Sequence, residues 1–490
     1  MTRAPIDSAI SGLLSVQPLS TQMISGVDFL GMASITLPIE ASSFRIGMMT
    51  DTFGGEFTTK RLLALLVLGA GMLIVFGAMA RIPNATMALN TYVGLYLAAF
   101  ALYLLAANMV SSLSGFRMLV VICLFALLFR IVLFPVRPTI STDIYRYVWD
   151  GRVQAEGINP YRYAPASPQL AHLRGPEWFW INHRKTHTPY PPVSQLVFTA
   201  VTRLFGSTVY PLKTLFVLCD LATIAILGLM LRHLRIPSGS SILYAWSPLI
   251  VTEFSGAGHQ DSMGIMLLLL ALYLLIRRRQ SWLPGILLAA SSLVKPYPLL
   301  AAPILARKDW VRLPSTLLIT SAILCLPYIG ARTHWLSGIA DYGFKWHRDD
   351  SLFALINSGL ALATNHHEAV ARVIVLLGIV AISVLMALGR SSDEKSLIQG
   401  VFTVLAVGFL LSPTVYPWYL AWTVPFLCII RSPGWLLFTG LAALCYVIPI
   451  YGEPAIRLIT YLPVYMLLLL PILPARLRFW ERPTGQRDRS

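Results

Sequence analysis

Apolar runs of about 20 residues recur along the chain from Arg61 almost to its C-terminal end, with short polar segments between them. A run of this length spans a bilayer as a helix. Since no alternating apolar and polar pattern competes with these runs, helices are predicted, because a helix satisfies its own backbone groups in lipid. The pattern indicates an all-α integral membrane protein with about 12–14 transmembrane helices.

The predicted spans are residues 61–80, 87–109, 117–135, 210–231, 240–254, 261–276, 281–295, 297–306, 312–330, 368–389, 397–413, 416–430, 434–450 and 456–473. Residues 193–205 are apolar as well, but they are too few to cross a bilayer and they include Arg203. A re-entrant segment or a half-span is expected there.

Composition agrees with a membrane protein: 56% of the residues are apolar and 12% are charged, against about 25% charged in soluble domains. The net charge of +16 does not indicate nucleic-acid binding, because the basic residues form short clusters between apolar runs. The five cysteines lie inside apolar runs without metal-ligand spacing, so neither disulfides nor zinc are predicted.

The basic clusters also predict the topology. If the excess of Lys and Arg faces the cytoplasm, both termini are cytoplasmic and two long polar stretches, 136–191 and 331–367, lie outside. Stretch 136–191 is itself basic, which is an exception to the rule and suggests an anionic ligand on the outer face. Residues 1–56 lack the pattern of a signal peptide and are expected to be a disordered extension. The transmembrane domain is placed at 57–475 and a basic cytoplasmic tail at 476–490.

The first outer stretch contains the run DIYRYVWDGRV at 143–153. On a helix Asp143, Arg146 and Asp150 share one face, so carboxylates and a guanidinium converge. The neighbouring face carries Tyr145 and Trp149, which suit a helix lying flat at the level of the lipid headgroups. An amphipathic helix along the membrane is predicted.

This run, together with GINPYRYAP at 157–165, resembles the first extracytoplasmic loop of bacterial polyprenol-phosphate-mannose-dependent mannosyltransferases, which are glycosyltransferase family 87-like members of the GT-C superfamily. Later motifs agree with the resemblance, which covers about residues 117–430: YPP at 190–192, EFSGAGHQD at 253–261, LVKPYP at 293–298 and LSPTVYPWY at 411–419. Many GT-C members have a D-x-D or E-x-D in the first loop, whereas Asp143 is followed by Ile144 and Tyr145. Metal dependence is therefore left open: no cofactor is implied with certainty, and a divalent metal remains an alternative.

The resemblance implies a polytopic GT-C fold in the inner (plasma) membrane with an extracytoplasmic active site. It implies transfer of a sugar, mannose by resemblance, from a polyprenyl phosphate to a glycan or glycolipid acceptor, with inversion at the anomeric carbon. Such a reaction needs a carboxylate base near the acceptor and cations near the departing phosphate. Asp143 is the candidate base. The candidates for binding the phosphate and sugar are Arg146, Asp150, Arg152, Tyr190, His259, Asp261, Lys295, Lys345, His347 and Arg348.

Plainer roles compete with these. Asp143 could cap a helix, Asp150 could pair with a neighbouring arginine as scaffolding, and Lys295 could be a lysine at a span end that reaches toward the interface. At the level of function the rivals are a transporter or flippase for a lipid-linked saccharide, and a non-catalytic scaffold of an envelope complex. The absence of a convincing internal repeat in the sequence argues against the transporter.

Overall fold

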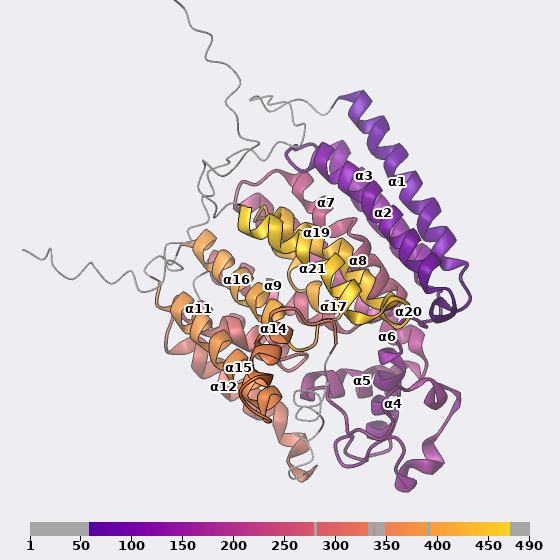
Figure 1. Cartoon of the computed structure of the whole chain (residues 1–490), viewed down its shortest axis with the longest axis vertical. Helices are drawn as coiled ribbons and strands as arrows, with labels where there is room; N and C mark the ends of the chain where they lie inside the picture. The colour runs from indigo at the N-terminus through magenta and orange to yellow at the C-terminus, as the bar shows by residue number, and fades with distance from the viewer. Residues whose placement is uncertain (1–57, 279–281, 332–337, 339–347, 390–392, 471–490) are drawn as a thin grey trace, which may run out of the picture. The chain divides into compact units, whose positions relative to one another are not determined.

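The computed structural model describes residues 58–278, 282–331, 338, 348–389 and 393–470, which belong to one compact unit. Helices dominate these residues, and the extended backbone among them amounts to an isolated bridge between Arg348 and Thr414. The prediction of an all-α membrane protein is confirmed. Figure 1 shows the first three helices running side by side, with the two shorter helices α4 and α5 near one end of the bundle.

Eight helices of the described residues are long and apolar enough to cross a membrane. They are α1 (Thr59–Ala80), α2 (Leu89–Val110), α3 (Phe116–Leu133), α6 (Val209–His233), α12 with the turn after it (Arg312–Ala331), α15 (His367–Ala387), α16 (Glu394–Leu411) and α19 with the turns after it (Pro433–Tyr451).

Most of the other predicted spans are shorter or broken helices within the described residues, and the helix Asp261–Arg278 is long enough but carries three charged residues. Segment 240–254 divides into short pieces, because Pro248 starts a new helix and the backbone then widens into a π-helical turn at Val251–Gly256. The helices of this segment are α7 (Ile242–Ala245) and α8 (Pro248–Ile250). The remaining predicted spans correspond to α9 (Asp261–Arg278), α10 (Trp282–Ser292), α11 (Ala302–Ala306), α17 (Pro417–Leu420), α18 (Val424–Leu427) and α21 (Glu453–Leu469).

The helix predicted in the first polar stretch is α4 (Asp143–Ala155), and it packs on α5 (Pro192–Phe205). The expectation that Tyr145 and Trp149 face the lipid headgroups is wrong, because both side chains are only 3% exposed in the folded protein. The two backbones approach closely at Gly151, where an added Cβ would lie 2.6 Å from the carbonyl oxygen of Phe198. Tyr147 stacks on the Phe198 ring at 4.8 Å between centroids. At 14 residues, α5 is about 21 Å long and does not span a bilayer of about 30 Å.

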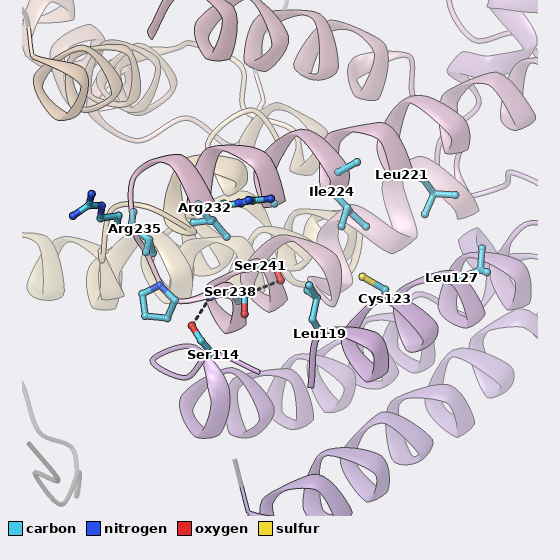
Figure 2. Close-up of a pocket in the computed structure, with 15 residues that line it drawn as sticks. Ser114, Leu119, Cys123, Leu127, Leu221, Ile224, Arg232, Arg235, Ser238 and Ser241 are labelled. Carbon is cyan, nitrogen blue, oxygen red and sulfur yellow. Dashed lines mark hydrogen bonds between the residues drawn. The ribbon is translucent and has the colours of Figure 1, made fainter. Parts of the chain in front are cut away.

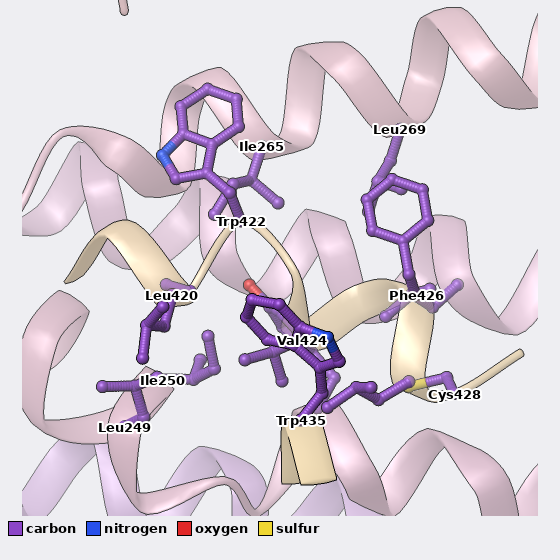
Figure 3. Close-up of a cluster of buried hydrophobic side chains, with 14 of the residues drawn as sticks. Leu249, Ile250, Ile265, Leu269, Leu420, Trp422, Val424, Phe426, Cys428 and Trp435 are labelled. Carbon is purple, nitrogen blue, oxygen red and sulfur yellow. The ribbon is translucent and has the colours of Figure 1, made fainter. Parts of the chain in front are cut away.

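The interior of the bundle is apolar, and its centre lies where α8, α9, α17 and α18 meet. Leu249, Ile265, Leu420 and Trp422 are all at most 1% exposed there (Figure 3). Gly264 permits the approach of Trp422, because a Cβ at that position would lie 2.5 Å from the indole ring. This packing fixes the indole nitrogen beside the polar residues at the start of α9.

A buried ion pair joins α3 to α6 inside the bundle. Arg130 Nε lies 2.5 Å from Asp220 Oδ2, Arg130 Nη2 donates to Asp220 Oδ1 at 3.1 Å, and both side chains are fully buried. Arg130 Nη1 also donates to the carbonyls of Ala126 and Ala245, while the Tyr244 hydroxyl donates to Asp220. The charges of both partners are thereby compensated away from water.

Candidate active site

Asp143 begins α4 and faces a polar cluster. Its Oδ1 accepts a hydrogen bond of 3.1 Å from Asn182 Nδ2, and its side chain is 18% exposed. Burial raises the pKa of Asp143 above its ordinary value, while the hydrogen bond from Asn182 and the charge of Lys295 act in the opposite direction. A carboxyl group that is partly accessible and has a raised pKa is suited to accept a proton near neutral pH.

His259 lies beside Asp143 because the chain turns sharply at Gly258. That glycine has φ +76°, and a Cβ on it would come within 2.6 Å of the Ile144 side chain. His259 Nδ1 is 4.0 Å from Asp143 Oδ2, and His259 Nε2 is 3.4 Å from Glu253 Oε2. The imidazole thus lies between two carboxylates from different parts of the sequence.

A stack of rings covers His259. The Trp418 ring lies 4.0 Å from the imidazole and 4.5 Å from the Tyr416 ring, centroid to centroid, and both pairs are nearly parallel. Pro417 starts α17 between the two aromatic residues, so the motif YPWY at 416–419 brings both rings to the same side. The stack fixes the orientation of the imidazole.

Lys295, which the sequence analysis gave as a candidate phosphate ligand, is the cation that pairs with Asp261. Its Nζ lies 3.0 Å from Asp261 Oδ2, and the other oxygen of Asp261 accepts 2.7 Å from Trp422 Nε1. Nζ also lies 4.9 Å from the centre of the Tyr419 ring. The Lys295 side chain is 11% exposed, and its charge acts on Asp143.

Arg146 and Asp150 form a second polar group one helical turn further along α4. Arg146 Nε donates 2.8 Å to Asp150 Oδ1, and Gln195 Nε2 of α5 donates 3.1 Å to Asp150 Oδ2. Arg146 Nη1 reaches the Thr186 carbonyl at 3.2 Å, whereas Nη2 is buried without a hydrogen-bond partner in the described structure. Tyr190 packs edge-on against Tyr147 on the same side. Asp150 thus lies in a buried ion pair with Arg146, which agrees with the structural role that the sequence analysis considered as the alternative.

Arg152 lies on another face of α4. Its Nη2 lies 3.3 Å from Glu177 Oε2 and bonds the Ser207 carbonyl, and Nη1 bonds the Leu173 carbonyl at 3.2 Å. These contacts connect α4 to the loop at 168–180 and to the start of α6. The structure therefore does not bring Arg152 into the cluster around Asp143.

Arg348 occupies the loop before α14 (Leu352–Ala361). Its amide donates to the Pro413 carbonyl at 3.1 Å, and its carbonyl accepts from Val415 at 2.9 Å. Its Nε is buried without a hydrogen-bond partner in the described structure, and its charge acts on Tyr416. Arg348 thus lies next to the segment that precedes the ring stack, through its backbone contacts with Pro413 and Val415. Lys345 and His347 lie outside the described residues.

The backbone of Asp349, the residue after Arg348, is strained, with φ +47°. Its amide donates 2.9 Å to Glu453 Oε1 of α21, and its carbonyl accepts 2.6 Å from the Tyr461 hydroxyl. Arg457 of the same helix pairs with Asp350 and with Glu453. These bonds fasten the loop that carries Arg348 to the last helix.

Asp349 makes the stability of the folded protein depend on pH. Burial and the charge of Glu453 raise the pKa of Asp349 to about 7. The folded protein therefore keeps this proton up to about pH 7, whereas the unfolded chain releases it near pH 4. The stabilisation from Asp349 is complete below about pH 4 and is lost as the pH rises to about 7.

We therefore expect the melting temperature of Asp349→Asn to increase relative to wild type as the pH rises from about 4 to about 7, because Asn stays neutral. Thermal denaturation in detergent across this range measures the difference, and Glu156→Gln, at an exposed carboxylate of the α4 end, is the control. Parallel curves for Asp349→Asn and wild type would contradict the assignment.

The sequence analysis did not single out Asn182, and it gave Glu253 and Trp418 only as members of longer motifs. Glu253 is 1% exposed and accepts 2.8 Å from the Tyr446 hydroxyl, although it stands in an apolar segment. An ionisable residue in a membrane segment is a functional candidate by default, so that signal was readable in the sequence. Asn182 and Trp418 carry no such signal. In the described part of the chain, no three His, Cys, Asp or Glu side chains are grouped so as to hold a metal ion.

The sequence of the chain matches the model of one protein family. Residues 45–309 match the model of the N-terminal domain of alpha-(1->6)-mannopyranosyltransferases, the MptA_B family. A relative from Mycobacterium tuberculosis named alpha-(1->6)-mannopyranosyltransferase A is 26% identical over 324 residues, which cover 58% of this chain and 60% of the relative. The protein of the same name from Corynebacterium glutamicum is 23% identical over 61% of this chain and 69% of its own. The match thus spans about three fifths of the length of the mycobacterial relative, and no solved structure matches the chain.

Proposed function

The chain belongs to the alpha-(1->6)-mannopyranosyltransferase family, and we propose that it transfers a mannosyl group from a polyprenyl phosphate to a hydroxyl group of a glycan or glycolipid. The family first indicated by the motif at 143–153 is thereby confirmed. The proposed reaction takes place at the outer side of the inner membrane, since the basic clusters assign 136–191 to that side.

The observation that carries the proposal is the convergence of Asp143, His259 and Lys295 from three distant segments. His259 Nδ1 lies 4.0 Å from Asp143, and the charge of Lys295 acts on the same carboxyl group. A transferase needs a carboxylate at the acceptor and a cation at the departing phosphate, and this cluster supplies both.

In the proposed reaction the acceptor oxygen attacks the anomeric carbon while Asp143 takes the hydroxyl proton. The bond between that carbon and the phosphate oxygen breaks, and polyprenyl phosphate leaves with the electron pair. Attack from the face opposite the phosphate inverts the anomeric centre. Lys295 retains two ammonium protons beyond the one directed at Asp261, so it could donate to the phosphate oxygens as their charge grows.

Arg348 is the second proposed phosphate ligand, because its buried Nε has no hydrogen-bond partner among the described residues. Arg146 and Asp150 are assigned to holding α4 on α5, and the buried Arg146 Nη2, which has no hydrogen-bond partner among the described residues, is proposed as a further donor. His259 positions Asp143 through its place between that carboxyl and Glu253.

We expect activity to depend on a lipid-linked donor. The sequence has no glycine-rich nucleotide-binding loop, so a nucleotide-activated mannose should not replace polyprenyl-phosphate mannose. The test supplies purified, delipidated protein with each radiolabelled donor and measures label in the acceptor. Heat-treated protein controls for spontaneous transfer. Sustained transfer from the nucleotide sugar, with polyprenyl phosphate absent, would refute the proposal.

A further inference from the structure

A groove of about 850 Å³ lies between α3 and α6 (Figure 2). Its volume is in the range of small-molecule sites, about 300–1,000 Å³. One wall is formed by residues at helical spacing on α3, namely Leu119, Cys123 and Leu127. The lining is mainly apolar along the spans and polar at one end.

The opposite wall is formed by α6, and small residues of this helix leave space in the groove. Ala225 and Gly228 line the groove on the same face of the helix as Leu221 and Arg232. A Cβ added at Gly228 would meet no heavy atom within 4 Å, so open space lies in front of this position. A lipid acyl chain fits such a groove, since small residues of α6 leave room between two membrane-spanning helices.

Two arginines stand at the polar end of the groove. Arg232 lies in the last turn of α6 and Arg235 follows it with φ +57°; both side chains are exposed. Neither has an ion-pair partner within the described part of the chain, and the nearby carboxylate of Glu394 is 3.0 Å from His233. Figure 2 shows Arg232 and Arg235 at the end opposite Leu221 and Leu127.

The loop that carries Arg235 is held in place. Ser238 N donates 3.2 Å to Ser114 Oγ, Gly239 N donates 3.0 Å to the Leu113 carbonyl, and Ser240 Oγ donates 2.8 Å to the Ser111 carbonyl. The loop is thereby fastened to the connection between α2 and α3. The backbone that carries Arg235 at the polar end of the groove is therefore held in place by hydrogen bonds.

We propose that this groove binds an anionic phospholipid, with an acyl chain along α3 and α6 and the headgroup phosphate on Arg232 and Arg235. The two arginines belong to a predicted cytoplasmic cluster, and anionic lipids are concentrated in that leaflet. From Lys213, which contacts the turn at Gly258, to Arg232 is about 28 Å along α6. The headgroup is thus distinct from the phosphate of the proposed donor.

Binding is measured by native mass spectrometry of the purified full-length protein after delipidation, with phosphatidylglycerol and phosphatidylcholine as probes. Phosphatidylglycerol should bind more tightly to wild type. The variant Arg232→Gln/Arg235→Gln should lose about 30-fold in affinity for it, from about 1 kcal/mol per arginine. Arg431→Gln, at an exposed arginine of another loop, should bind as wild type.

Filling the groove gives a second test. Gly228→Leu should reduce binding of phosphatidylglycerol, whereas Gly94→Leu, at an exposed glycine of α2 that also faces open space, should not. Bound lipid should also slow modification of the exposed Cys123 by a membrane-permeant maleimide in wild type but not in the double glutamine variant. Modification of Cys325 is the internal reference.

The proposal is overturned if phosphatidylcholine binds as well as phosphatidylglycerol, or if the glutamine substitutions leave the preference unchanged. Protection of Cys123 by polyprenyl phosphate but not by phosphatidylglycerol would assign the groove to a different lipid. Protection by glycerol phosphate alone would show that the acyl chain has no part in binding. The result does not depend on transferase activity, so it stands apart from the proposed function.

Discussion

Asp143→Asn should lower turnover by about two to four orders of magnitude, because a general base contributes about 10² to 10⁴ in rate. Asn preserves the shape of the side chain, and Asp143 is the first residue of α4 while Thr142 is its N-cap, so α4 should form normally. Donor binding should persist while the catalytic step is lost. Turnover of polyprenyl-phosphate mannose by the purified variant, together with donor affinity, separates these two effects.

Glu156→Gln is the matched control, since Glu156 is an exposed carboxylate at the other end of α4. It should keep wild-type turnover. The wild-type rate should also fall on acidification at a pH above the ordinary pKa of an aspartate, because burial raises the pKa of Asp143 and the base acts only when ionised. Near-normal turnover by a well-folded Asp143→Asn protein would remove this residue from the catalytic role.

Arg130→Met should destabilise the fold by about 3–5 kcal/mol, because it leaves Asp220 as an uncompensated charge in the bundle interior. Among the described residues, the Tyr244 hydroxyl would be the donor left to Asp220. The carbonyls of Ala126 and Ala245 would also lose their shared donor. Reversible denaturation in mixed micelles gives the free energy of unfolding.

Removing both charges should restore much of that loss, so Arg130→Met/Asp220→Leu is expected to be more stable than Arg130→Met alone. Arg117→Met is the control on the same helix, because Arg117 is exposed at the start of α3. A free energy of unfolding for Arg130→Met within about 1 kcal/mol of wild type would show that the pair does not support the bundle.

The sequence predicted the features that depend on local pattern. The apolar runs indicated the helices of the bundle, and the motif at 143–153 indicated the helix that begins at Asp143. Segment 240–254 is predicted as one span because most of its residues are apolar. Its division at Pro248 and its π-helical turn depend on backbone geometry that hydropathy does not contain.

The contacts between distant segments could not be predicted in the same way. His259 was a candidate, but its place between Asp143 and Glu253 depends on the turn at Gly258 and on the packing of α4. Arg130 and Asp220 are hidden in apolar runs 90 positions apart, and spacing alone does not pair them. Tertiary packing decides which ionisable groups meet inside a bundle.

We propose that this membrane protein makes a glycosidic bond rather than moving a saccharide across the membrane. Detergent-solubilised protein distinguishes the two activities, because no barrier remains to be crossed. The polyprenyl phosphate released is measured together with the mannoside formed on the acceptor. We expect equal amounts of the two products over many turnovers, and nearly none with Asp143→Asn. Binding of the donor without release of polyprenyl phosphate or formation of a mannoside would contradict the proposed transferase activity.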